Sequence, residues 1–283
     1  MKVKITKMQG CGNDFVILDY EEFQKMNCEM SEAAKKLCDR NFGIGADGLI
    51  IPNTKTENAD IGWFFYNSDG TTAQMCGNGM RCFAKYVYDS KLVNKKEFTV
   101  QTLAGEIKPQ ILDNGFIRVN MSKPILDCEK IPFIPNHNLN YKISVKNRIF
   151  EGNAISMGNP HFVIFIKDDE DLLKLAKEYG PDIENAAEFP EKTNVEFIKI
   201  KSTKKIELCV WERGCGITLA CGTGACASVV AGILNGYLEN SVDVELLGGT
   251  VNVTWNGTSE KTDEDVFLTG PAKYVFNANL NWN

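Results

Sequence analysis

Residues 221–234, Cys-Gly-Thr-Gly-Ala-Cys-Ala-Ser-Val-Val-Ala-Gly-Ile-Leu, decide the fold class of this 283-residue chain. The glycines beside Cys221 favour a tight turn, and a helix from Ala225 to Leu234 would be apolar on nearly every face. A helix of that kind is stable only when it is buried on all sides. We therefore expect an α+β domain in which strands surround this helix.

A similar turn, Cys76-Gly77-Asn78-Gly79, lies 145 residues earlier and also leads into a predicted helix, at 80–91. Three more landmarks repeat in the same order: a strand that follows a Gly-Asn pair, an amphipathic helix and an aromatic strand. The pairs are 12–17 and 158–164, 31–39 and 169–179, and 63–67 and 208–212. Ser31 and Asp168 are the expected N-caps of the amphipathic helices.

This internal repeat predicts two homologous domains related by a pseudo-twofold axis. We expect each to be a mixed sheet or barrel wrapped around a central helix, with the active site in the cleft between them. The predicted domains are residues 1–122 with a C-terminal strand at 273–283, and residues 123–272.

Composition excludes several classes of protein. The net charge is −6 and no basic block stands out, which argues against nucleic-acid binding. The longest apolar stretch, 220–234, is shorter than the roughly 20 residues of a membrane span. Residues 1–8 alternate like a strand and carry no export signal, so we expect a cytoplasmic protein. The ten cysteines form no Cys-x-x-Cys pair and only two histidines are present, so no metal site is expected.

The two cysteine turns have a chemical interpretation. Backbone N–H groups at a helix start lack partners, and with the helix dipole they lower a thiol pKa and bind a carboxylate. A pseudo-twofold axis would place Cys76 and Cys221 on opposite sides of one substrate Cα. One thiolate would remove the proton and the other thiol would return one, which inverts the centre without a cofactor. A structural Cys76–Cys221 disulfide is the alternative, and a reducing compartment disfavours it.

Polar residues near these turns suggest a second head group on the substrate. Arg213 suits a carboxylate and Glu212 an ammonium group. Four asparagines flank apolar strands, although asparagines there also make ordinary turns: Asn13, Asn67, Asn159 and Asn194. Together they fit a substrate that carries an α-amino acid at each end. A lone histidine such as His161 is more often structural than catalytic.

Two longer segments, 67–81 and 212–225, resemble the two signatures of the diaminopimelate epimerase family, and 12–15, 40–48, 158–161 and 193–196 resemble its other blocks. The resemblance implies a cofactor-independent homodimer that interconverts LL- and meso-2,6-diaminopimelate, with Cys76 and Cys221 as the acid and base. It also implies that His161 and Glu212 adjust the thiols. The implied contacts of the reacting carboxylate are Gly77, Asn78, Gly222 and Thr223, and those of the distal centre are Asn13, Asn67, Asn159, Asn194, Glu212 and Arg213.

The chain departs from the family pattern at three positions: Thr71 replaces a serine, Gly48 replaces a glutamine of some members, and Cys215 adds a thiol. Three other functions stay open. Another racemase on this scaffold, of histidine or hydroxyproline type, would lack the Glu212 and Arg213 set. A non-catalytic amino-acid-binding protein would lack one of the two thiols, and a thiol-redox protein would carry a Cys-x-x-Cys motif.

Overall fold

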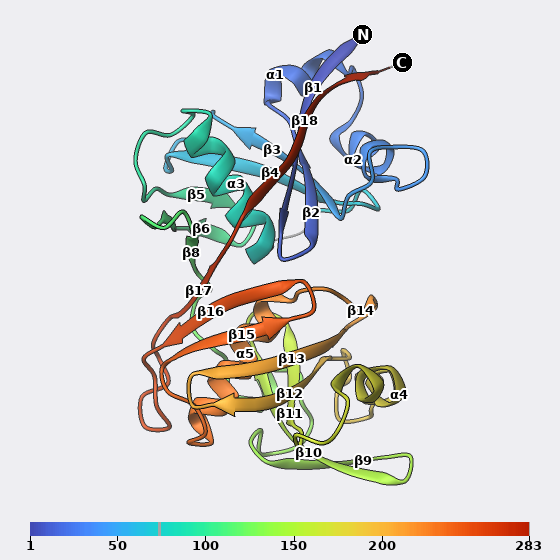
Figure 1. Cartoon of the computed structure of the whole chain (residues 1–283), viewed down its shortest axis with the longest axis vertical. Coiled ribbons are helices and arrows are strands. Elements are labelled where there is room, and N and C mark those ends of the chain that lie inside the picture. The colour runs from blue at the N-terminus through green and yellow to red at the C-terminus, as the bar shows by residue number, and fades with distance from the viewer. Residues whose placement is uncertain (73–74, 283) are drawn as a thin grey trace. The chain divides into compact units, whose positions relative to one another are not determined.

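The structure is a computed structural model that describes residues 1–72 and 75–282. It contains two compact units, shown in Figure 1: unit 1 is Met1–Asn120 with Thr269–Asn283, and unit 2 is Met121–Leu268. The two boundaries predicted from the sequence, after residues 122 and 272, lie two and four residues C-terminal to the boundaries in the structure, after residues 120 and 268. Asn283, the last residue of the predicted strand 273–283, lies outside the described residues.

Unit 1 is built on a seven-stranded mixed sheet in the order β18-β1-β2-β3-β4-β5-β6, and it also contains a β7-β8 hairpin that lies outside this sheet. Its elements are β1 (Lys2–Gly10), β2 (Asn13–Ile17), α1 (Tyr20–Lys25), α2 (Met30–Cys38), β3 (Gly48–Asn53), β4 (Ile61–Asn67), α3 (Gly77–Asp89), β5 (Val100–Thr102), β6 (Gly105–Ile107), β7 (Pro109–Ile111), β8 (Ile117–Asn120) and β18 (Lys273–Asn281).

Unit 2 has a second mixed sheet, in which β16-β15-β13-β12-β11-β10-β9 are neighbours and β14 pairs with β13. Its elements are η1 (Cys128–Lys130), β9 (Tyr141–Val145), β10 (Arg148–Ser156), β11 (Pro160–Phe165), α4 (Leu172–Glu184), β12 (Asn194–Ser202), β13 (Lys205–Glu212), β14 (Gly216–Ile217), α5 (Gly222–Leu234), β15 (Ser241–Leu246) and β16 (Gly249–Trp255). The strand β17 (Val266–Gly270) then leads back to unit 1.

The two sheets repeat one pattern of strand directions. From β1 to β6 the successive pairs are antiparallel, parallel, antiparallel, parallel and antiparallel. The strands β10, β11, β12, β13, β15 and β16 follow the same sequence of directions. The helix α2 follows β2 as α4 follows β11, and α3 follows β4 as α5 follows β13. The predicted α+β duplication with mixed sheets is therefore confirmed.

Each sheet carries helices on both sides, and the central helix, α3 or α5, is more buried than the helices on the other side. In unit 2, α5 packs on β10, β11, β12 and β16, while α4 covers the opposite side of β12 and β13. Every residue of α5 from Gly224 to Gly232 is buried, as its all-round apolar sequence predicts. In unit 1, α3 packs on β1, β2 and β3, and α1 and α2 together cover the other side of these strands. A cysteine turn therefore opens the central helix of each unit.

The predicted caps of the two outer helices were wrong by two or three residues. The N-cap of α2 is Glu29, without a side-chain bond, and Ser31 lies inside the helix, where its Oγ donates to the Gly70 carbonyl. The N-cap of α4 is Asp171 instead of Asp168, and its carboxylate accepts from Lys174 N. Local sequence patterns place helix ends only to within a few residues, because several polar residues compete to cap the first turn.

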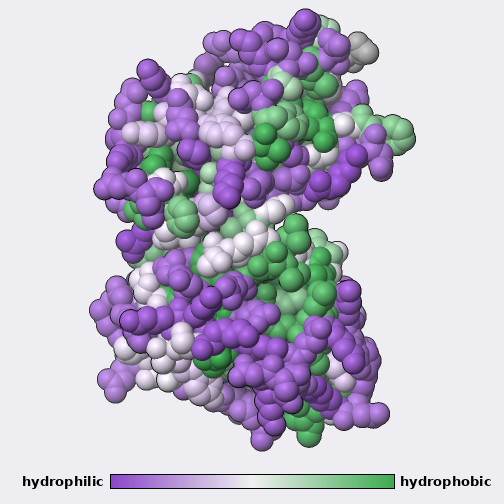
Figure 2. Space-filling model, viewed as in Figure 1, coloured by the Kyte–Doolittle hydropathy of each residue, from purple (hydrophilic) through white to green (hydrophobic). Residues whose placement is uncertain are grey.

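The outer surface is largely hydrophilic, as Figure 2 shows for one face of each unit. Hydrophobic areas interrupt it on both units (Figure 2). The exposed large hydrophobic side chains of unit 2 include Leu219 and Leu247, which are 52% and 51% exposed. Across residues 1–72 and 75–282, no helix is long and apolar enough to span a membrane.

Candidate active site

The two candidate catalytic cysteines occupy the same local position. Cys76 is the N-cap of α3 and Cys221 is the N-cap of α5. Each Sγ accepts a hydrogen bond from the backbone N–H three residues later, from Gly79 and Gly224, at 3.4 Å in both cases. Both sulfur atoms therefore lie at the positive end of a helix dipole, beside backbone donors that an anion can share.

In unit 1, polar side chains converge on Cys76 from the start of β2. The Cys76 thiol donates to Asn13 Oδ1 at 3.6 Å, and Asn78 Nδ2 donates to the same oxygen at 3.2 Å. Asn13 Nδ2 in turn donates to Asp47 Oδ2 at 2.5 Å, which fixes the orientation of the amide. At the end of β4, Asn67 Nδ2 donates to Thr71 Oγ1 at 3.0 Å, so the threonine hydroxyl takes part in the turn.

Arg81 is a polar residue of this site that sequence reasoning missed. Its side chain is fully buried on α3, and it donates to Asn78 Oδ1 at 2.9 Å and to the Pro271 carbonyl at 3.2 Å. Arg81 therefore holds the Asn78 amide with its nitrogen toward Asn13. The available signal was an arginine three residues after Asn78, on the same side of a helix that is otherwise apolar there.

In unit 2, a chain of hydrogen bonds leads to Cys221. Its Sγ lies 3.5 Å from Thr223 Oγ1, which accepts from Asn159 Nδ2 at 3.4 Å. Asn159 Oδ1 lies 3.1 Å from His161 Nε2, and His161 Nδ1 lies 2.7 Å from Glu196 Oε1. Three of the residues predicted from the sequence, Asn159, His161 and Thr223, are thereby connected to the thiol.

The electrostatics of Cys221 correct the expectation of a lowered thiol pKa. Burial raises its pKa well above the ordinary value, and the Glu212 and Glu196 carboxylates raise it further. The Gly224 N–H and Thr223 lower it by less. Burial also raises the pKa of Glu212, whose Oε1 accepts from Thr218 Oγ1. Desolvation therefore outweighs the helix start, and Cys221 rests as a thiol in this state.

The residues predicted for the distal head group are only partly assembled. The Asn194 side chain is buried and accepts from the Arg213 backbone N–H at 3.0 Å, while its own amide donates to the Pro160 carbonyl at 2.8 Å. The Arg213 side chain is exposed and donates to the Glu191 carbonyl at 2.9 Å. Asn194 therefore positions the Arg213 loop, and the guanidinium remains accessible.

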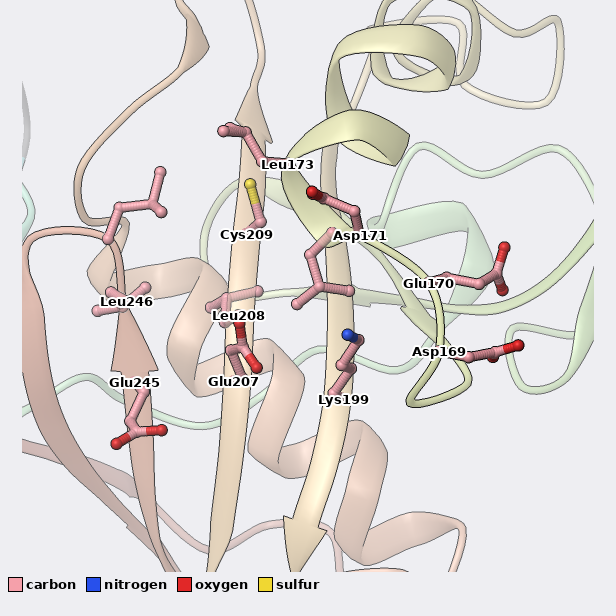
Figure 3. Close-up of a pocket in the computed structure, with 12 residues that line it drawn as sticks. Asp169, Glu170, Asp171, Leu173, Lys199, Glu207, Leu208, Cys209, Glu245 and Leu246 are labelled. Atoms are coloured by element: carbon pink, nitrogen blue, oxygen red, sulfur yellow. The ribbon is translucent and has the colours of Figure 1, made fainter.

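One pocket of unit 2 lies on its sheet beside the start of α4, and none of the predicted site residues lines it. Its volume is about 530 Å³, and Figure 3 shows Lys199, Glu207 and Glu245 on adjacent strands with the segment that leads into α4. Five carboxylates and one lysine line it over a floor of leucines and Cys209. No group of three or more His, Cys, Asp or Glu in the described ranges has the arrangement of a metal site.

Comparison with known proteins bears on this geometry. The family model described as diaminopimelate epimerase matches residues 5–126 and 153–275, which include both cysteine turns. The chain belongs to the diaminopimelate epimerase family. The diaminopimelate epimerase of Carboxydothermus hydrogenoformans is 47% identical over 277 residues, covering 97% of this chain and 98% of the relative. That of Halothermothrix orenii is 44% identical over 290 residues, covering 99% and 98%.

Solved structures outside the family share its fold at low identity. A hydroxyproline epimerase from Agrobacterium vitis has a TM-score of 0.69 at 12% identity, covering 99% of this chain and 92% of that one. A Bacillus anthracis phenazine biosynthesis protein of the PhzF family has a TM-score of 0.65 at 16% identity, covering 99% of both chains. These likenesses support a duplicated mixed-sheet fold that is common to several enzyme families.

Proposed function

We propose that this protein interconverts LL- and meso-2,6-diaminopimelate, a step in the biosynthesis of lysine and of peptidoglycan precursors. The observation that carries the proposal is the repeated cysteine N-cap, with Cys76 on α3 and Cys221 on α5. The name borne by relatives that are 40–47% identical supplies the substrate. The other scaffold function, a racemase of hydroxyproline type, has only a fold likeness at 12% identity to support it.

In the proposed mechanism both thiols reach one Cα from opposite sides. The N–H groups of Gly77 and Asn78, and of Gly222 and Thr223, bind the adjacent carboxylate and stabilise the charge that develops when the proton leaves. Cys221 rests as a thiol, so it donates the new proton, and Cys76 as thiolate removes the old one. The two cysteines exchange these roles for the opposite stereoisomer. This transfer between two side chains requires no cofactor.

The distal amino-acid group gives the specificity in this proposal. The exposed Arg213 guanidinium binds the distant carboxylate in place of the Glu191 carbonyl, and Glu212 receives the distant ammonium group. The amides of Asn13, Asn67, Asn159 and Asn194 complete the set. A substrate with a single amino-acid group would leave these polar residues without hydrogen-bond or ionic partners, so we expect such a substrate to be turned over more slowly.

Proton NMR in D₂O tests the reaction directly. Purified protein, LL-diaminopimelate and a reductant, without pyridoxal phosphate, are expected to lose the α-proton signal as the meso isomer appears. We expect Cys76→Ser and Cys221→Ser each to reduce epimerisation at least about a hundredfold while the fold persists. Exchange of other amino acids without exchange of diaminopimelate would leave the racemase chemistry and overturn the substrate.

We further propose that the enzyme is a cytoplasmic homodimer that binds no nucleic acid. The strand β18 stands at one end of the unit 1 sheet and exposes three large side chains, Tyr274, Val275 and Phe276, which would pair well with a second copy. Light scattering after gel filtration tests the dimer: a mass of one chain at micromolar concentration would exclude it.

A further inference from the structure

A buried carboxylate on α4 binds the loop that carries Glu212 and Arg213. Glu184 is the last residue of α4 and is only 5% exposed. Its Oε2 accepts from Trp211 Nε1 at 2.7 Å, and its Oε1 accepts from the Gly214 N–H at 3.0 Å. The two donors come directly before and directly after the Glu212-Arg213 pair in sequence. One carboxylate therefore binds both ends of the segment that is proposed to contact the distal head group.

The position of Glu184 is unfavourable for a carboxylate. The C-terminal end of a helix is the negative end of its dipole, and a buried carboxylate also loses its hydration. The ion pair with Lys192 compensates little, because its atoms are 3.8 Å apart and the lysine side chain is 53% exposed. A neutral residue at the end of α4 would avoid both penalties. What the carboxylate provides in return is two acceptor oxygens for the loop.

The loop itself turns at two glycines. Gly214 and Gly216 have φ values of 77° and 75°, in the left-handed region that glycine adopts without strain. Within the turn, the Cys215 N–H donates to the Glu212 carbonyl at 3.0 Å. Glycine loses more conformational freedom on ordering than any other residue, so a turn of this kind is intrinsically weak. Contacts from outside the turn therefore contribute to its order.

The contact with Trp211 also fixes the end of β13. Side chains alternate along a strand, so Trp211 and Glu212 point to opposite faces of the sheet. The Trp211 side chain lies against α4, because a Cβ atom on Gly180 would be 2.6 Å from it. Glu212 interacts on the other face with Cys221. A residue that fixes Trp211 from the α4 side thus fixes where Glu212 emerges on the side of the cysteine turn.

We propose that Glu184 is a positioning residue for the distal head group of the substrate. It acts through the loop: its carboxylate fixes Trp211 and Gly214, and with them the positions of Glu212 and Arg213. The role in substrate binding rests on the proposed epimerase function. The arrangement of the loop does not, because it involves only residues of unit 2 and no substrate.

The test uses Glu184→Gln, which keeps the shape of the side chain. An amide has one acceptor oxygen, and its NH₂ group cannot accept a hydrogen bond, so one of the two bonds to the loop is lost. Glu170→Gln is the control. Glu170 precedes α4 and accepts from both terminal nitrogens of Arg148, at 2.6 and 2.9 Å, away from the loop.

Hydrogen exchange followed by NMR, without substrate, measures how firmly the loop is held. We expect slow exchange of the Trp211 indole N–H and of the Gly214 amide N–H in the wild type and in Glu170→Gln. In Glu184→Gln, at least one of the two is expected to exchange at least about tenfold faster. The chain has four tryptophans, so the indole signals are readily assigned. Fast exchange of both groups in the wild type would overturn the proposal, even if Glu184→Gln failed to fold.

Kinetics measure the role in binding. Glu184→Gln is expected to raise KM for LL-diaminopimelate about tenfold, with kcat within about threefold, because the distal group is bound equally in the ground state and the transition state. A purely structural defect reduces the amount of active enzyme, which lowers kcat and leaves KM unchanged. The effect should also depend on Arg213. In an Arg213→Ala background, Glu184→Gln is expected to raise KM less than about threefold.

Three kinetic results would overturn the proposal: equal KM increases in the two backgrounds, a loss of kcat with unchanged KM, or a KM increase in Glu170→Gln as large as that in Glu184→Gln. If no protein turns over diaminopimelate while hydrogen exchange follows the expected pattern, the proposed function fails. The role of Glu184 in binding that substrate fails with it, and its contribution to the order of the loop stands.

Discussion

Replacing Gly224 with alanine tests how tightly unit 2 is packed around Glu196. The new Cβ would lie 2.7 Å from Glu196 Oε1, and because that carboxylate is fully buried it has to move. Overpacking costs about 1–3 kcal/mol, and the higher helix propensity of alanine offsets about 0.5–1 kcal/mol of it. We expect a net loss of about 1–2 kcal/mol, which lowers the Tm of a unit this size by about 2–8 °C.

The duplicated fold provides the control at the matching position. A Cβ atom on Gly79 would lie 3.4 Å from the Phe15 ring and 3.5 Å from Cys76 Cβ, which is ordinary van der Waals contact. Gly79→Ala is therefore expected to leave the free energy of unfolding unchanged or to raise it by up to about 1 kcal/mol. Calorimetry on both variants compares the two units directly.

A third variant identifies the cause of the loss. In a Glu196→Ala background the carboxylate is gone, so Gly224→Ala is expected to cost at least about 1 kcal/mol less than it does in the wild type. Equal costs in the two backgrounds, or equal effects of Gly224→Ala and Gly79→Ala, would refute the argument that the Glu196 contact sets the size of residue 224.

Three further predictions concern the thiols and the buried arginine. Because the pKa of Cys221 is raised, its alkylation without substrate should be slow at pH 8 and should accelerate by up to about tenfold per pH unit above that. The exposed Cys215 should be alkylated first. Mass spectrometry after timed labelling measures the order, and a Cys221 that reacted first at pH 7 would contradict the raised pKa. Arg81→Ala should lower the free energy of unfolding by about 3 kcal/mol or more, because it leaves a cavity and removes the hydrogen bond to Asn78. Urea unfolding measures this change, and a midpoint equal to that of the wild type would contradict it. Mild oxidant should inactivate the enzyme by joining Cys76 to Cys221, and the idea fails if both thiols can still be alkylated in the inactive protein.

The repeat and the helix starts were predictable because they are encoded locally. Glycines around Cys76 and Cys221 mark tight turns, and the apolar stretch after Cys221 predicts a buried helix. Turns and buried helices of this kind depend mainly on neighbouring residues, so both copies of the repeat could be recognised from the sequence. The matching strand directions of the two units agree with the predicted duplication.

Glu196 could not be identified from its sequence context. In Val195-Glu196-Phe197 the alternation of apolar and charged residues predicts that Glu196 faces water. However, α4 covers the side of β12 that carries Val195 and Phe197, and α5 covers the other, so both faces are buried. The prediction of a lowered Cys221 pKa was wrong for a related reason. Burial raises this pKa most and the carboxylates of β12 and β13 raise it further, and a local rule about helix starts includes neither effect.

The strand β18 has a consequence for the order in which the chain folds during synthesis. Unit 2 is continuous, from Met121 to Leu268, so all of its strands are synthesised before residues 273–281. The strand β1, by contrast, is made first but pairs on one side with β18, which is made last. One edge of β1 therefore stays unpaired until the end of the chain has been made, and the sheet that is translated first is the last to receive all of its strands.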